Sequence, residues 1–263
     1  MERKVFGALG TVIIGIAVIA GIGTYVAAAK NDPGITQATP AGSFTAEDGK
    51  SYPQVKLNLN VYPNSGFGGH HGAGGGAHPD WVSYALGGPN GEILADAKSG
   101  TNFQVPPHTA VTITVYQYDS GETLNNDFFA YVRGTVGGTA KFVKSYDTKA
   151  KANASPETVI TNIPADMVGH TFTLHGMSDG KDQLFVSVPL MMSIDEEVGA
   201  AEEGATESGY VQNPTKTTFT FITGDEGEYV WNCEFPCGDG TIARFGNAMS
   251  AMGYMSGHFI VKA

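Results

Sequence analysis

Hydrophobic and polar positions alternate along most of the chain, with the two-residue period of half-buried β-strands. The alternation is clearest in residues 55–62, in residues 103–118, which contain a proline turn, and in residues 160–174. Residues 128–143 predict a hairpin that turns at Gly137-Gly138. Shorter segments of the same kind are residues 184–190, 215–223, 228–232 and 258–262. The pattern predicts an all-β protein built from short strands.

An uncharged apolar run from Val5 to Ala29 begins the chain, directly after Arg3 and Lys4. About 20 apolar residues span a bilayer, so the run is long enough to cross a membrane. Basic residues before such a run keep the N-terminus in the cytoplasm. We predict that residues 1–30 are a retained single-pass anchor in the cell membrane. The alternative is a cleaved signal peptide with Ala27-Ala28-Ala29 as its processing site. Either interpretation makes the rest of the chain extracytoplasmic, as an anchored or a secreted domain.

Composition divides the remainder of the chain into a linker and a domain. Residues 31–51 are rich in Pro, Gly, Thr, Ala and Ser, which is typical of a tether. Residues 52–263 are predicted to form one β-domain, and the overall hydrophobic content of 41% is enough for a core. The chain contains 36 glycines and 13 prolines, and both residue types disfavour helix interiors.

The chain is acidic, with a formal net charge of -11. Without residues 1–30 it carries 12 basic and 25 acidic groups, a net charge of -13. Such a domain repels nucleic-acid phosphates, so we expect no nucleic-acid partner. A basic electron-transfer protein would instead be steered towards it. The acidic residues 193–208 are predicted to form a solvated loop, or alternatively a docking patch for such a partner.

The candidate chemistry lies in the last forty residues of the chain. Both cysteines, Cys233 and Cys237, follow a predicted strand, and Met249, Met252 and Met255 precede the final strand. Thiolate and thioether groups select copper over hard cations, and flanking strands would hold the loop that carries them. No phosphate-binding glycine motif, Ser-His-Asp signature or Cys-x-x-Cys pair is present. We therefore expect a metal protein that is not an enzyme.

Histidines at three places in the chain are candidates for further ligands. His170 begins an alternating strand together with Phe172 and Leu174. Such a histidine is usually a satisfied core residue, but the sulfur-rich loop favours a ligand here. The glycine-rich residues 66–78 contain three histidines and are predicted to be an exposed loop, with a metal site as the alternative. His258 alternates with Phe259, and we expect its side chain to point away from the core.

The order of these residues resembles the cupredoxin family. The resemblance consists of an early histidine, His170, then Tyr229-x-x-x-Cys233, and then Met255-x-Gly257 before the last strand. It covers the last hundred residues and, loosely, the strands from residue 103 onward. It implies a cupredoxin-like Greek-key β-sandwich with inserted loops, in which the copper loop folds against the histidine-bearing strand. It also implies that His170 is the imidazole ligand, Cys233 the thiolate and Met255 the axial thioether.

One departure from the family leaves the metal centre open. No histidine lies between Cys233 and Met255, where the second histidine of a blue-copper protein would be expected. The spacing Cys-x-x-x-Cys-Gly resembles instead the binuclear CuA centre of cytochrome oxidase subunit II, but the histidine that follows there is also missing. We favour mononuclear copper bound by His170, Cys233 and Met255, completed by Cys237 or a methionine. A binuclear centre that recruits His258 or a glycine-loop histidine is the second hypothesis.

The resulting functional prediction is one-electron transfer by copper at the outer face of the membrane. An alternative is a metal-free structural or binding module, for example in a respiratory membrane complex. In that case Cys233 and Cys237 would form a disulfide, as exported cysteines commonly do. Another alternative is a copper carrier that uses Met249, Met252 and Met255.

Overall fold

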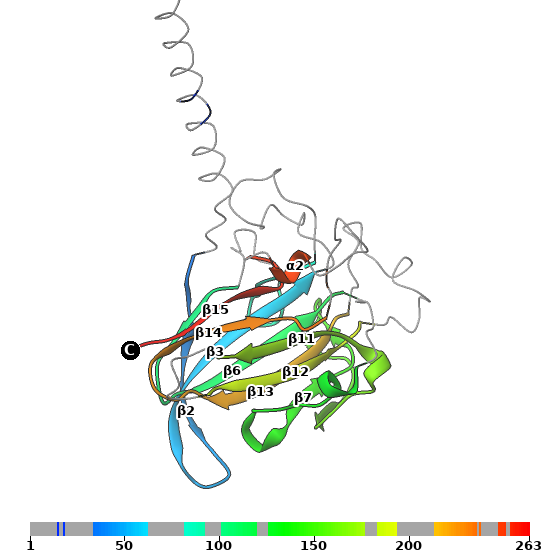
Figure 1. Cartoon of the computed structure of the whole chain (residues 1–263). Helices are drawn as coiled ribbons and strands as arrows, with labels where there is room; N and C mark the ends of the chain where they lie inside the picture. The colour runs from blue at the N-terminus through cyan, green and yellow to red at the C-terminus, as the bar shows by residue number, and fades with distance from the viewer. Residues whose placement is uncertain are drawn as a thin grey trace, which may run out of the picture.

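Fifteen strands and a few short helical turns make up the part of the chain that the computed structural model describes. The described residues are 15, 18, 34–62, 82–92, 101–119, 126–176, 183–193, 213–235, 237, 247–250 and 253–263. Most of the strands belong to two sheets that form the two layers visible in Figure 1. The turns are η2 (Asp127–Ala130), η3 (Val136–Gly138), η4 (Ala165–Met167) and α2 (Asn247–Ser250).

The first sheet carries the C-terminal strands and has the order β1-β5-β15-β14-β11-β12. Both pairings of β5 are parallel, and the other neighbours in this sheet are antiparallel. The strands are β1 (Thr36–Gln37), β5 (Phe103–Val105), β11 (Val168–His175), β12 (Phe185–Met191), β14 (Gly227–Asn232) and β15 (Ser256–Val261).

The second sheet has the order β10-β7-β13-β6-β3-β2, and β4 also pairs with β3. Its central strands β3 and β6 are parallel, whereas β6 and β13 are antiparallel. The strands are β2 (Thr39–Thr45), β3 (Ser51–Tyr62), β4 (Ser83–Leu86), β6 (Ala110–Gln117), β7 (Ala140–Val143), β10 (Glu157–Ile160) and β13 (Thr215–Ile222). A small separate pair is formed by β8 (Tyr146–Asp147) and β9 (Ala152–Asn153).

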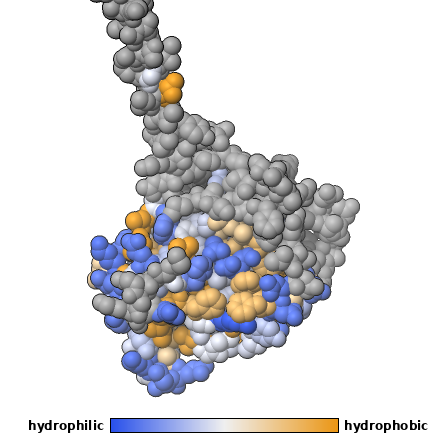
Figure 2. Space-filling model, in the orientation of Figure 1, coloured by the Kyte–Doolittle hydropathy of each residue, from blue (hydrophilic) through white to orange (hydrophobic). Residues whose placement is uncertain are grey.

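An aromatic core fills the space between the two sheets. Phe172 of the first sheet lies against Phe219 of the second, with ring centroids 5.5 Å apart, and Phe259 lies 5.7 Å from Phe221. These side chains are buried, because alternate residues of each strand face the opposite layer. In Figure 2 hydrophilic residues lie at the lower end of the body, where the turn between β2 and β3 lies, and at several other places on the visible face. The predicted all-β sandwich is therefore confirmed.

The predicted linker, residues 31–51, is partly wrong, because β1 and β2 lie within it and pair with the two sheets. Both are edge strands, where proline and glycine are tolerated. In β2 the register shifts between Pro40 and Ser43, and Gly42 between them has a φ of 87°. A Pro- and Gly-containing composition was therefore compatible with a strand, and the sandwich begins at Thr36.

The predicted hairpin in residues 128–143 is also wrong. Only β7 forms, at the end of this range, and the residues before it contain the turns η2 and η3 with two isolated bridges between them. The chain crosses to the other sheet at Arg133, whose N–H and C=O both hydrogen-bond Ser187 of β12. Gly137 and Gly138 have positive φ values of 68° and 62° and make a tight turn between that bridge and β7.

The predicted membrane anchor, residues 1–30, lies outside the described residues apart from two of its positions. In the described parts of the chain, no helix is both long enough and apolar enough to cross a membrane. The glycine- and histidine-rich residues 66–78 and the acidic residues 194–208 also lie outside the described residues.

Candidate metal centre

Three strand ends bring the candidate ligands together. His170 lies near the start of β11, just after an irregularity in its pairing with β12. Cys233 directly follows β14, the neighbour of β11 in the same sheet, and Thr173 pairs there with Asn232. The proximity of His170 and Cys233 that the cupredoxin resemblance implied is thus present, although the two residues are 63 positions apart.

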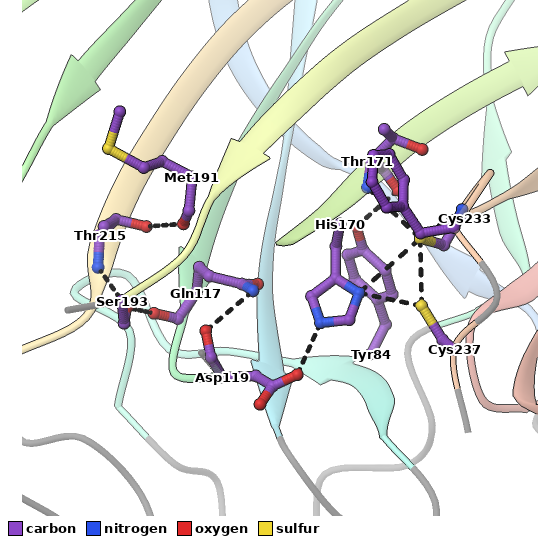
Figure 3. A network of polar contacts seen from close by, with 11 residues as sticks. Tyr84, Gln117, Asp119, His170, Thr171, Met191, Ser193, Thr215, Cys233 and Cys237 are labelled. Atoms are coloured by element: carbon purple, nitrogen blue, oxygen red, sulfur yellow. Dashed lines mark hydrogen bonds and ion pairs between the residues drawn. The ribbon is translucent and has the colours of Figure 1, made fainter. Parts of the chain in front are cut away.

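The imidazole of His170 and both cysteine sulfurs form a compact triangle (Figure 3). Nδ1 of His170 lies 3.0 Å from Sγ of Cys237 and 3.7 Å from Sγ of Cys233, and the two sulfurs are 3.4 Å apart. All three residues are buried. One nitrogen and two sulfurs thus face one another within 4.8 Å, away from solvent.

Both cysteines are free thiols in the structure. Their separation of 3.4 Å is far longer than a sulfur–sulfur bond of about 2.05 Å. The Cys233–Cys237 disulfide of the metal-free alternative is therefore not formed in this structure, which presents the two sulfurs as separate donors.

Backbone groups fix the position of the Cys233 sulfur. The N–H groups of Thr171 and Phe235 each point at Sγ from 3.4 Å. The hydroxyl of Thr171 accepts a hydrogen bond from the N–H of Glu234 at 2.9 Å, which attaches the cysteine loop to the histidine-bearing strand. Two donors directed at one sulfur stabilise its thiolate form.

Met255 is joined to the cysteine loop through a chain of backbone hydrogen bonds. Cys233 donates to the carbonyl of Met255 at 2.9 Å, Met255 donates to Ala248 at 2.9 Å, and Ala248 donates to Cys237 at 3.3 Å. Ala248 belongs to α2, so this short helix is hydrogen-bonded both to Cys237 and to Met255, which directly precedes the last strand. Met255 is fully buried in the hydrophobic core that also contains both cysteines.

Asp119 is a side-chain partner of His170 that the sequence did not predict. Its Oδ2 lies 2.6 Å from Nε2 of His170, on the side of the ring opposite the sulfurs (Figure 3). Asp119 follows β6, in the other sheet, and its side chain is 14% exposed. An acidic residue that immediately follows a buried strand was the only signal that could have suggested it.

The electrostatics of the site follow from these contacts. Burial lowers the pKa of His170, but its hydrogen bonds to Asp119 and Cys233 and their negative charges outweigh burial and raise it to about 10. Burial also raises the pKa of Cys233, yet hydrogen bonds from Cys237 and His170 and the charge of His170 hold it well below its usual value. Without metal, the site therefore contains an imidazolium between a carboxylate and a thiolate.

An aromatic layer lies beneath the triangle. Trp231, two residues before Cys233, stacks on Phe172 with centroids 5.0 Å apart and meets the edge of Tyr84 at 4.9 Å. The Tyr84 hydroxyl donates to the carbonyl of Thr171 at 3.1 Å. Burial, with the nearby charges of Cys233 and Cys237, raises the pKa of Tyr84 well above its usual value. All three aromatic side chains are fully buried.

The other predicted ligands lie elsewhere or outside the described residues. His258 pairs with Val230 in the middle of β15 and does not belong to the His170–Cys233–Cys237 cluster. Met249 lies on α2 and packs against the core, whereas Met252 lies outside the described residues. Among the described residues, no other group of three His, Cys, Asp or Glu side chains is close enough to hold an ion.

Comparison with known proteins gives distant structural neighbours only. No protein-family model matches the sequence, and no curated protein matches it. Rusticyanin from Thiobacillus ferrooxidans is 12% identical over 80% of this chain and 77% of that chain, with a TM-score of 0.34. Auracyanin B is 13% identical over 86% of this chain and 99% of that chain, with a TM-score of 0.27. At such scores a likeness does not establish function, so the assignment of the site depends on this chain's own residues.

Proposed function

We propose that this chain is a membrane-anchored, extracytoplasmic copper protein of the cupredoxin type that transfers single electrons and is not an enzyme. The observation that carries the proposal is the buried cluster of His170, Cys233 and Cys237, whose donor atoms lie within 4.8 Å of one another. The acidic charge of the chain supports a basic redox protein as partner, free or within a respiratory complex.

The donor set fits copper better than other ions. Calcium and magnesium require oxygen ligands, whereas this cluster offers nitrogen and sulfur. A structural zinc site usually has four His, Cys or carboxylate ligands. Only three such residues meet among those that the structure describes. A buried thioether such as that of Met255, which the cupredoxin resemblance makes the axial ligand, suits copper and is not a usual ligand of zinc.

A bound copper would supply a centre that alternates between Cu(I) and Cu(II). The residues around it are suited to fast electron exchange, because the hydrogen bonds to Cys233 and His170 hold their donor atoms in place. Burial of all three ligands excludes water, and Cys233 connects the site covalently to β14.

We favour one copper ion over two. The triangle of one nitrogen and two sulfurs is compact, and all three atoms can face a single ion. A CuA-like pair would need additional ligands, and the described His258 lies outside the cluster. The additional ligands of a second ion would therefore have to come from the histidines in residues 66–78. A single copper ion does not require them.

Thiol counting followed by copper titration of the full-length, detergent-purified protein tests the proposal. We expect two free thiols, stoichiometric copper binding and an intense thiolate-to-copper absorption band. The EPR hyperfine pattern distinguishes one copper nucleus from two. A disulfide together with no copper binding would favour the structural module. Binding of Cu(I) without a stable Cu(II) form would favour the carrier.

Two variants locate the site. Cys233→Ala should remove the absorption band and weaken copper binding by more than the 10- to 100-fold typical of residues that only support a ligand. Met249 lies on α2, between Cys237 and Met255, and outside the triangle. Met249→Leu should therefore leave the band in place. A Cys233→Ala protein that keeps the band would remove Cys233 from the ligand set.

A further inference from the structure

The hydrogen bond between Asp119 and His170 joins the proposed copper site to the opposite sheet. Oδ2 of Asp119 lies 2.6 Å from Nε2 of His170, and the exposed fractions of the two side chains are 14% and 3%. We propose that Asp119 is a positioning residue that directs Nδ1 of His170 at the sulfurs, and that its negative charge favours oxidised copper and makes this a low-potential centre. The inference rests on the proposed function.

Hydrogen bonds hold the backbone of Asp119 in place. The backbone carbonyl of Asp119 accepts from Nε2 of Gln117 at 3.1 Å and from the N–H of Ser193 at 3.2 Å. The hydroxyl of Ser193 in turn donates to the carbonyl of Gln117 and accepts from the N–H of Thr215 at 3.0 Å. This network, seen to the left of His170 in Figure 3, ties the end of β6 to β13.

The geometry selects one orientation and one tautomer of the imidazole. An ionised carboxylate can only accept, so the hydrogen bond at 2.6 Å requires a proton on Nε2. The neutral ring then has its lone pair on Nδ1, which is the atom 3.0 Å and 3.7 Å from the two sulfurs. A carboxylate behind a ligating histidine commonly fixes the ring in this manner and increases its basicity.

The charge of Asp119 also affects the two copper states differently. Among the described residues, the site would contain two thiolates and one carboxylate, which is more negative charge than Cu(I) or Cu(II) can neutralise. In a buried site these charges are poorly screened, so adding an electron is opposed more strongly than in water. Asp119 therefore stabilises Cu(II) more than Cu(I). Each tenfold difference between the two affinities lowers the potential of a one-electron couple by 59 mV.

Asp119→Asn tests this inference, because asparagine preserves the shape of the side chain and removes its charge. We expect Cu(II) affinity to fall by about 10- to 100-fold, Cu(I) affinity to fall less, and the reduction potential to rise accordingly. Asp119→Glu should restore a potential close to that of the wild type, since it returns the carboxylate. Nitrogen-15 NMR of the diamagnetic Cu(I) wild-type protein should show the His170 proton on Nε2.

Asp225→Asn is the matched control, because Asp225 pairs with His108 at 3.0 Å on the protein surface. It should leave the potential and both copper affinities unchanged. An unchanged potential in Asp119→Asn, equal losses of Cu(I) and Cu(II) affinity, or a Cu(I) protein without a proton on Nε2 would overturn the inference while leaving the copper protein intact. The NMR measurement decides the matter if Asp119→Asn does not fold. A wild-type protein that binds no copper would overturn the proposed function itself.

Discussion

Two histidine–aspartate pairs lie at the two ends of strand β6, and they differ in almost everything except their chemistry. His108 precedes the strand and pairs with Asp225 at 3.0 Å, with exposed fractions of 68% and 65%. Asp119 follows the strand and pairs with His170 at 2.6 Å, with exposed fractions of 14% and 3%. The strand between the two pairs has eight residues and is roughly 26 Å long, at about 3.3 Å per residue.

The difference shows that burial and a third partner turn an ordinary ion pair into a site. On the surface, solvent screens the charges of His108 and Asp225, and such a pair contributes little. At the other end of β6, both nitrogens of His170 are engaged, one by a carboxylate and the other by two thiols. Removing either charge there leaves the other in a poorly solvated environment.

Replacing each histidine by alanine is the most direct way to break the comparison. In the metal-free protein, His170→Ala leaves the charges of Asp119 and Cys233 buried without their cation, and should lower the free energy of unfolding by about 3 kcal/mol. His108→Ala should change it by less than about 1 kcal/mol. Denaturant unfolding followed by tryptophan fluorescence gives both values.

The same two variants should separate equally clearly in copper binding. His170→Ala is expected to bind copper more weakly, and His108→Ala is expected to bind it as the wild type does. Equal stabilities for the two variants would mean that the buried pair is no stronger than the exposed one. An unchanged copper affinity in His170→Ala would remove this histidine from the ligand set.

The sequence was sufficient to predict the sandwich and to identify as candidates His170, Cys233 and Cys237, the three residues that the structure brings together. Period-two alternation identified β3, β6, β11, β13 and β14. Burial alternates clearly along β13 and β14, which have one face against the core, whereas β6 and β11 are buried along almost their whole length. The order of His170 and Cys233 resembled a known family, and adjacent strands β11 and β14 place the two residues side by side. The two-residue pattern depends on short stretches of chain, whereas the proximity of His170 and Cys233, 63 positions apart, was expected only from the family resemblance.

Features that depend on distant contacts could not be predicted in this way. Asp119 meets His170 across 51 positions and between two sheets, so its local sequence, an acidic residue after a buried strand, does not identify His170 as its partner. The edge strand β2 contains proline and glycine and had the composition of a linker. Arg133 forms a β-bridge with Ser187 of β12 in place of a pairing within the expected hairpin. This bridge requires β12 to lie beside Arg133, which the local sequence does not indicate.

The pH dependence of copper binding sharpens the comparison further. The pKa of His170 is about 10, so its ring is protonated on both nitrogens below that value in the metal-free site. Copper must displace the proton on Nδ1 and, where Cys237 binds as a thiolate, the thiol proton of Cys237 as well, so the apparent affinity should rise as pH increases towards 10. Each proton released contributes up to about a tenfold gain per pH unit. Competition titrations with a Cu(I) chelator between pH 6 and 9 measure the slope, and His108→Ala should leave it unchanged. A flat profile would contradict an imidazolium in the metal-free site.

A third carboxylate, Glu92, which is less exposed than Asp225 and more exposed than Asp119, provides the test with the smallest expected effect. Hydrogen bonds from Asn90 outweigh burial and, with Lys151 at 3.1 Å, lower the pKa of Glu92 to about 2. Because this pKa is depressed, the stabilisation is complete above the ordinary pKa of about 4.5 and is lost as pH falls towards 2. Glu92→Gln should therefore lower stability by less than about 1 kcal/mol at pH 7, and the difference from the wild type should shrink as pH falls towards 2.

Glu157→Gln serves as the control for Glu92, because Glu157 also pairs with a lysine, Lys141, at 3.2 Å, but with a more exposed side chain. Thermal unfolding of both variants and the wild type at a series of pH values gives the comparison. A Glu92→Gln difference that is as large at pH 2 as at pH 7 would show that the glutamate acts through packing, since about half of its charge in the folded protein is then gone. A difference that disappears on acidification would mean that the charge of Glu92 stabilises the fold. Its contribution would then lie between that of the exposed pair at one end of β6 and that of the buried pair at the other, because hydrogen bonds from Asn90 compensate for partial exposure.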